Sequence, residues 1–167
     1  IPIIENIIDK VDDIIIGGGM SFTFIKALGG KIGSSIHEDS MTEKALSILE
    51  LAEQKNTKIH LPVDVVCAKE FKEGAESKIF AIDSISDEYE GLDSGPKSLE
   101  KFKKIIMSSK TILWNGPVGV FELESFSKGT QEIGTAIAES TKSGAFSLVG
   151  GGDSVAAVKK FKLENEV

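Results

Sequence analysis

Residues 112–122 read Ile-Leu-Trp-Asn-Gly-Pro-Val-Gly-Val-Phe-Glu, an apolar strand that ends at a glycine–proline turn. Within a few residues this segment offers an aromatic ring, a carboxamide, free backbone amides and a carboxylate. Ligands of open α/β sheets bind outside the carboxyl ends of the strands. The segment therefore predicts one wall of a ligand site.

Two further segments share a pattern in which a short apolar strand is followed by three glycines and a helix. They are residues 13–19 (Asp-Ile-Ile-Ile-Gly-Gly-Gly) and 146–152 (Phe-Ser-Leu-Val-Gly-Gly-Gly). Strands and helices alternate along the rest of the chain, which is typical of βαβ units. We therefore expect the α/β class, with a three-layer, doubly wound, mostly parallel sheet of the Rossmann-like type.

Hydrophobic periodicity gives approximate bounds for these elements. Strands are expected at residues 12–16, 58–61, 63–68, 78–82, 111–114 and 146–149. Helices are expected at residues 20–28, from 41 to beyond 52, 94–108, 128–141 and 154–162. Two of the helices should begin with a local N-cap, one with a capping box over residues 40–43 and the other with Ser94. Trp114 is expected in the core.

Composition limits the possible functions. The chain has 167 residues and a net charge of −7, and all nineteen of its basic residues are lysines. The negative charge argues against nonspecific binding to nucleic acid. No apolar run approaches the roughly 18 to 20 residues that cross a bilayer. Cys67 is the only cysteine, which favours a reducing compartment, and we expect a cytoplasmic protein.

The absence of arginine bears on any phosphate chemistry, because planar bidentate recognition of phosphate is mainly an arginine task. Phosphate would have to be held by Mg²⁺, helix N-termini, lysines or a partner. The second triple-glycine turn continues into Asp153 and Ser154, which add a carboxylate and a hydroxyl to the free amides of a helix start. This turn predicts a metal–phosphate site. The alternative is that Asp153 or Ser154 is an ordinary N-cap.

The first triple-glycine turn continues into Met20 and Ser21 and carries no acid. It suits a neutral, flat group such as adenine lying against bare backbone. The alternative is a tight turn with only a packing role. Neither turn matches the dinucleotide fingerprint G-x-G-x-x-G, because Phe22 and Val155 occupy the third glycine position, and no P-loop motif is present.

Three residues of the 112–122 segment are candidates for ligand contact. Glu122 can accept hydrogen bonds from ribose hydroxyls, Asn115 can hold a sugar or phosphate group, and Pro117 can line a flat pocket. The alternative for Glu122 is an acid in the first turn of a helix.

Six blocks of the sequence resemble phosphoglycerate kinases in order and spacing. The similarity covers essentially the whole chain, and the 112–122 segment is its most specific part. The blocks are residues 15–20, 32–36, 61–64, 91–96, 112–122 and 150–154.

The resemblance implies the C-terminal, nucleotide-binding domain of a two-domain kinase that transfers a phosphoryl group between 1,3-bisphosphoglycerate and ADP, giving 3-phosphoglycerate and Mg·ATP. It implies a metal contact at Asp153 and phosphate contacts at Gly152 and Ser154. It places the adenine on Gly18, Gly19, Ile36, Gly91 and Leu92. It places the sugar and phosphates on Asn115, Pro117 and Val120, and the ribose on Glu122.

The resemblance also implies that residues 1–167 are the nucleotide-binding part alone, shortened at both ends and without the phosphoglycerate-binding domain that carries the family's catalytic arginine. We therefore expect no catalytic residue within the chain, a monomer that is inactive by itself, and weak binding of Mg·ADP. Two other classes stay open from the residues themselves, an NAD-dependent oxidoreductase and a noncatalytic nucleotide-binding or structural module.

Overall fold

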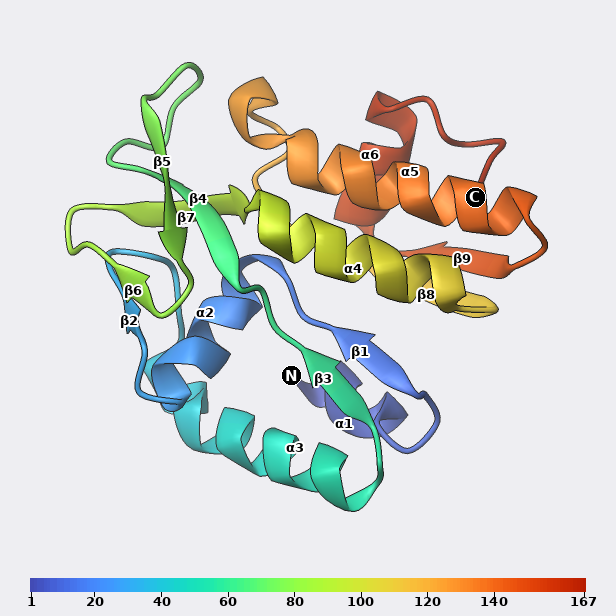
Figure 1. Cartoon of the computed structure of the whole chain (residues 1–167), viewed down its shortest axis with the longest axis horizontal. Helices are drawn as coiled ribbons and strands as arrows, with labels where there is room; N and C mark the ends of the chain where they lie inside the picture. Colours follow the sequence, from blue (N-terminus) through green and yellow to red (C-terminus); the bar gives the residue numbers. More distant parts are fainter.

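A computed structural model describes residues 1–167 as six α-helices and nine strands (Figure 1). The helices are α1 (Pro2–Ile7), α2 (Gly18–Ala27), α3 (Thr42–Gln54), α4 (Pro96–Ser108), α5 (Lys128–Lys142) and α6 (Gly152–Lys160). The strands are β1 (Asp13–Ile15), β2 (Lys31–Ile32), β3 (Lys58–His60), β4 (Asp64–Ala68), β5 (Ser77–Ala81), β6 (Ser84–Ile85), β7 (Glu90–Ser94), β8 (Thr111–Asn115) and β9 (Phe146–Gly150). Two 3₁₀ turns, η1 (Asp39–Met41) and η2 (Glu124–Phe126), complete the chain.

The strands form four small sheets, and most of the pairings are parallel. Parallel pairs join β1 to β3, β2 to β6 and β8 to β9, whereas β5, β4 and β7 form an antiparallel sheet. The expected α/β class with mostly parallel strands is confirmed. The antiparallel sheet was not expected, because β7 contains Gly91 and Asp93, which have low strand propensity, and it forms by pairing with β4.

The two largest apolar clusters lie against the two sheets that carry the triple-glycine turns. Helices α4 and α5 lie side by side and bury Phe102 and Ile137 against Trp114 of β8, so the expected core position of Trp114 is confirmed (Figure 1). Helices α1, α2 and α3 pack around Ile14 of β1. The opposite face of the β8–β9 pair is exposed and presents the apolar side chains of Leu113, Phe146 and Leu148. None of the helices has the length and apolar content needed to cross a membrane.

The expected local helix caps are wrong. Helix α3 follows η1 with Met41 at its N-cap and no side-chain cap, so Ser40 and Glu43 form no capping box. Helix α4 has Gly95 rather than Ser94 at its N-cap. Its first amides are bound instead by a carboxylate from β4, since the amides of Lys97 and Ser98 donate to Asp64 at 3.1 and 2.8 Å.

Candidate functional site

Both triple-glycine turns lie at the carboxyl end of a parallel strand and lead directly into a helix. The first joins β1 to α2 and the second joins β9 to α6. The middle glycine of each turn has a positive φ, 64° at Gly18 and 86° at Gly151. Residues with a Cβ adopt such values only at a cost, which explains the glycine at these two positions.

The first turn lies against the loop that follows β8. A Cβ on Gly17 would be 2.7 Å from a methyl of Val118, and one on Gly18 would be 3.2 Å from the carbonyl oxygen of Pro117. A Cβ on Gly19 would be 2.9 Å from the Cγ2 methyl of Ile36, whose side chain is 71% exposed. The structure therefore brings Gly18, Gly19, Ile36 and Pro117 together, with bare backbone next to an exposed apolar side chain.

A buried serine connects Ile36 to the next predicted pair, Gly91 and Leu92. Ser35 is 2% exposed, and its hydroxyl accepts a hydrogen bond of 2.9 Å from the amide of Gly91. Leu92 is itself buried, and its carbonyl accepts a hydrogen bond of 2.8 Å from the amide of Val120. Ser35 therefore fixes Ile36 and Gly91, two of the predicted adenine contacts, relative to one another. Leu92 fixes the backbone of Val120 through its carbonyl. Sequence reasoning missed Ser35, although it lies within a block that carried the family resemblance.

The second turn lies against the end of β8 through polar groups. Asn115 pairs with Gly150 in the parallel register, and its Oδ1 is 2.8 Å from the position of a Cβ on Gly151. The hydroxyl of Ser154, which is fully buried, accepts a hydrogen bond of 2.5 Å from the amide of Gly116. The indole Nε1 of Trp114 donates to the carbonyl of Gly116 at 2.8 Å. Both backbone groups of Gly116 are thus fixed by side chains.

Helix α6 begins at the last glycine of this turn, Gly152, and its N-cap is Gly151. The alternative interpretation of Asp153 or Ser154 as the N-cap is therefore wrong. The amides of the first helical turn have no carbonyl partner within the helix and carry the positive end of the helix dipole. The carboxylate of Asp153 is exposed beside them and forms no hydrogen bond or ion pair with another side chain. This end of the site suits an anion together with a cation.

The structure contains no cluster of three or more His, Cys, Asp or Glu side chains that could hold a metal ion by themselves. The donor set at α6 is one free carboxylate. Mg²⁺ commonly takes one or two carboxylates and completes its shell with water and substrate phosphates. Asp153 is therefore suited to coordinate a Mg²⁺ ion whose other ligands are water and the phosphates of a bound nucleotide.

Glu122 lies in an exposed turn between β8 and η2, which excludes the alternative of an acid in a first helical turn. Its side chain makes no hydrogen bond or ion pair. It joins the rest of the site through the loop 117–122, whose other residues contact the first glycine turn and β7. Four predicted residues (Asn115, Pro117, Val120 and Glu122) thus lie along this segment, and Glu122, at its exposed end, makes no hydrogen bond to the other predicted residues through its side chain.

Asp93 is a second residue that sequence reasoning missed. It is 4% exposed on β7, and its carboxylate accepts hydrogen bonds of 2.9 Å from the amides of Ser94 and Gly129. Burial raises the pKa of Asp93 to about 7, although the two amides and Lys128 oppose the shift. The residue lies within the 91–96 block. Its partner Gly129 is far away in sequence, so no local pattern could reveal the contact.

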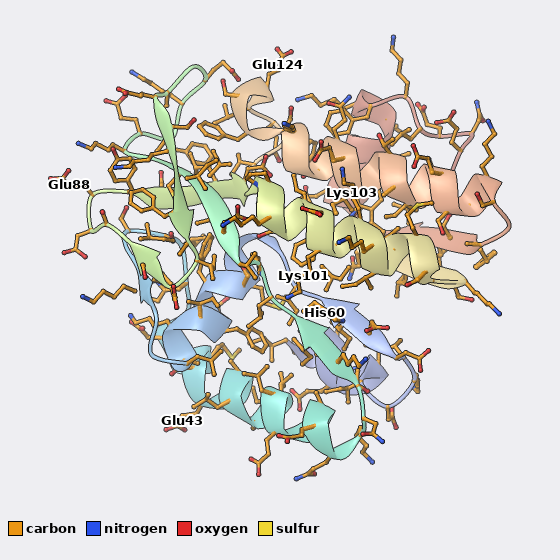
Figure 2. The ribbon with its side chains drawn as sticks, in the orientation of Figure 1. Glu43, His60, Glu88, Lys101, Lys103 and Glu124 are labelled. Carbon is orange, nitrogen blue, oxygen red and sulfur yellow. The ribbon has the colours of Figure 1, made fainter.

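A polar hollow of about 590 Å³ lies outside this site, between α4 and α5. Its walls include Lys103 of α4, labelled in Figure 2, and Glu132 of α5, whose charged groups are 3.9 Å apart. None of the predicted site residues lines this hollow, so it takes no part in the site built around the glycine turns.

Comparison with known proteins gives one consistent family. The family model described as "Phosphoglycerate kinase" matches residues 1–167. The phosphoglycerate kinase of Thermosipho africanus (strain TCF52B) is 51% identical over 168 residues, and that of Porphyromonas gingivalis (strain ATCC BAA-308 / W83) is 51% identical over 167 residues. These matches cover 100% of this chain and 42% and 40% of the two relatives, so the chain spans about two fifths of their length.

Solved structures agree with the sequence matches. The structure of phosphoglycerate kinase from Coxiella burnetii superposes with a TM-score of 0.94 at 43% identity, over 98% of this chain and 42% of that one. The crystal structure of phosphoglycerate kinase from Pyrococcus horikoshii OT3 gives a TM-score of 0.71 at 29% identity, over 95% of this chain and 40% of that one.

Proposed function

The chain belongs to the phosphoglycerate kinase family, and we propose that it supplies the nucleotide side of phosphoryl transfer between 1,3-bisphosphoglycerate and ADP, giving 3-phosphoglycerate and ATP. The observation that carries this proposal is that residues 115–122, which are the end of β8 and the loop after it, contact both triple-glycine turns. An apolar surface at one turn and an anion-binding helix start at the other suit the two ends of a nucleotide.

The adenine lies on the first turn in this proposal. Gly18 and Gly19 present bare backbone at the edge of the ring, because neither carries a side chain. The exposed side chain of Ile36 lies directly against Gly19 and adds an apolar surface beside that backbone. Gly91 and Leu92 complete the pocket, Gly91 through its backbone and Leu92 by supporting Val120.

The sugar and phosphates follow the loop toward α6. Pro117 and Val120 line the path, Glu122 accepts hydrogen bonds from the ribose hydroxyls, and Asn115 holds the sugar–phosphate junction. The phosphates end at the free amides of Gly152 and its neighbours. Ser154 belongs to this end as well, since its hydroxyl holds Gly116 at the phosphate side of the loop.

Asp153 would hold Mg²⁺ shared with the phosphates. When bound, the ion neutralises phosphate charge and keeps the phosphate oxygens in a fixed arrangement. The carboxylate orients the metal-bound nucleotide relative to α6, while the helix amides hold the phosphate oxygens directly.

Transfer itself requires charge that these residues do not supply. Phosphoryl transfer depends mainly on positioning and on stabilising charge on the moving group, and arginine is well suited to that task. The chain has no arginine and a net charge of −7. We therefore propose that phosphoglycerate is bound by residues outside these 167, and that the chain has no catalytic turnover by itself. We also propose a monomer acting in the cytoplasm.

The metal assignment can be tested by titrating Mg·ADP calorimetrically into the 167-residue chain and two variants. Asp153→Ala removes the proposed ligand, and Glu43→Ala removes an exposed acid from the first turn of a different helix, α3 (Figure 2). Loss of one charge-assisted contact should weaken binding of Mg·ADP by Asp153→Ala about tenfold. Glu43→Ala and ADP without magnesium serve as controls.

Each result bears on a separate part of the proposal. Equal affinities of Asp153→Ala and the unmodified chain for Mg·ADP would remove Asp153 from the metal site. No binding of Mg·ADP by the unmodified chain would contradict the nucleotide assignment. A coupled ATP assay should give no turnover with this chain, and measurable turnover would contradict its proposed dependence on residues elsewhere.

A further inference from the structure

Three consecutive residues at the end of β7 hold the loop that carries the proposed ribose contacts. The carbonyl of Leu92 accepts a hydrogen bond of 2.8 Å from the amide of Val120, and the hydroxyl of Ser94 donates to the carbonyl of Val118 at 3.4 Å. Between these contacts, a Cβ on Gly119 would come closer than 3.0 Å to Oδ1 of Asp93. The loop is thus in direct contact with the Asp93 carboxylate.

The same carboxylate binds the start of α5. Its Oδ2 accepts a hydrogen bond of 2.9 Å from the amide of Gly129, the second residue of the helix, and its Oδ1 accepts one of 2.9 Å from Ser94. A Cβ on Gly129 would also clash with Oδ1. Asp93 therefore lies enclosed between its own strand, the loop 117–122 and the N-terminus of α5.

We propose that Asp93 is a positioning residue for the nucleotide site, whose carboxylate fixes the loop 117–122 against α5 and so sets the affinity for the nucleoside. This inference rests on the proposed nucleotide-binding function. Asp93 does not touch the ligand. It acts through Gly119 and through the neighbouring contact between Leu92 and Val120.

The surroundings of Asp93 make its charge sensitive to pH near neutrality. From α5, Lys128 favours the ionised form and Glu132 disfavours it. On β4 the residue paired with Asp93 is Val66, and residues 117–121 of the loop are uncharged. Protonation turns one of the two carboxylate oxygens from an acceptor into a hydroxyl, and these oxygens bind the amides of Ser94 and Gly129 and contact Gly119. We therefore expect the contacts of Asp93 with α5 and with the loop to loosen as the pH falls through about 7.

The first experiment follows the loop without any ligand. In a ¹⁵N NMR titration of the 167-residue chain, the amides of Gly119, Val120 and Gly129 should shift together with a midpoint near pH 7. Asp93→Asn should abolish this shared titration. Glu132→Gln should lower the midpoint and Lys128→Gln should raise it, and these two variants keep the test valid if Asp93→Asn does not fold.

The second experiment measures affinity for adenosine, which carries no group that titrates between about pH 6 and 8. At pH 8, Asp93→Asn should bind adenosine about fivefold more weakly than the unmodified chain, because one accepted hydrogen bond is lost. At pH 6 the two affinities should converge. The matched control is Asp64→Asn, because Asp64 is another buried carboxylate that binds helix-start amides, at α4. It should lower stability without changing adenosine affinity or the titration of Gly119.

The outcomes separate the two proposals. If the three amides do not titrate together, or if Asp93→Asn retains both the affinity and the pH profile of the unmodified chain, the role of Asp93 is wrong. If the amides titrate but the unmodified chain does not bind adenosine, the proposed nucleotide site itself is wrong, and a role of Asp93 in affinity is wrong with it.

Discussion

The two triple-glycine turns can be compared position by position. Gly17, Gly18 and Gly19 correspond to Gly150, Gly151 and Gly152, and the next residues pair Met20 with Asp153 and Ser21 with Ser154. In both turns the middle glycine has a positive φ and the serine is almost fully buried. The backbone conformation of the middle glycine and the burial of the serine are therefore similar in the two turns.

The turns differ in what packs against them. The first meets the apolar side chains of Val118 and Ile36, and the hydroxyl of Ser21 donates to the carbonyl of Gly18 within its own turn. The second meets Asn115, and the hydroxyl of Ser154 accepts from the amide of Gly116 in the loop after β8. Comparable turns thus acquire different chemistry from different parts of the 115–122 segment and, at the first turn, from Ile36.

The largest expected difference concerns the middle glycines. Gly151 has φ 86° and ψ 148°, a region open almost only to glycine, and a Cβ there would be 2.8 Å from Asn115 Oδ1. Gly151→Ala should lower the free energy of unfolding by about 3 kcal/mol, and Gly18→Ala by about 1 kcal/mol, because φ 64° lies in the left-handed helical region.

Urea denaturation followed by circular dichroism measures both losses. Gly150→Ala is the control, because no neighbouring atom lies within 4 Å of its Cβ position and its φ is not positive, so its effect should be small. Equal losses for Gly151→Ala and Gly18→Ala would show that the two turns do not differ in backbone strain.

The buried serines should give the next largest difference. Ser154→Ala leaves the amide of Gly116 without its acceptor and should cost about 2 kcal/mol. Ser21→Ala removes a donor from a carbonyl and should cost about 1 kcal/mol. Only Ser154→Ala should change the emission of Trp114, the single tryptophan, because its indole binds the carbonyl of Gly116. Unchanged emission would mean that Ser154 does not control the position of Gly116.

Much of the fold follows from local sequence patterns. The helix expected at 128–141 is observed as Lys128–Lys142, and the strand expected at 111–114 as Thr111–Asn115. Two of the failures have nonlocal causes. Strand β7 depends on pairing with β4, and α4 receives its cap from Asp64 rather than from the adjacent Ser94. A pattern confined to neighbouring residues contains neither contact.

In the candidate site, too, the local features could be predicted from the sequence and the nonlocal contacts could not. Glycines at strand–helix junctions predicted both turns, because positive φ is a local requirement. The polar contacts that hold the site together join residues far apart in sequence. Ser154 is 38 residues from Gly116, and Ser35 is 56 residues from Gly91. Serines are common in all loops, so only the folded arrangement distinguishes these two from the others.

The smallest expected effects come from the last glycine of each turn, and they separate the two turns by ligand. Gly152→Ala should stabilise the chain by a few tenths of a kcal/mol, because alanine favours a helical conformation more than glycine does, whereas Gly19→Ala should leave stability nearly unchanged because Ile36 must shift to admit the Cβ. The Cβ introduced by Gly19→Ala would cover the backbone proposed to hold adenine and would lie 2.9 Å from the Cγ2 methyl of Ile36. Gly19→Ala should therefore weaken adenosine binding about threefold, or roughly 0.7 kcal/mol.

At Gly152 the Cβ meets no protein atom within 4 Å, so adenosine affinity should not change, whereas the affinity for Mg·ADP should fall. If both variants weakened adenosine equally, the assignment of adenine to one turn and phosphate to the other would be wrong, because a ligand without phosphates has no reason to sense the start of α6.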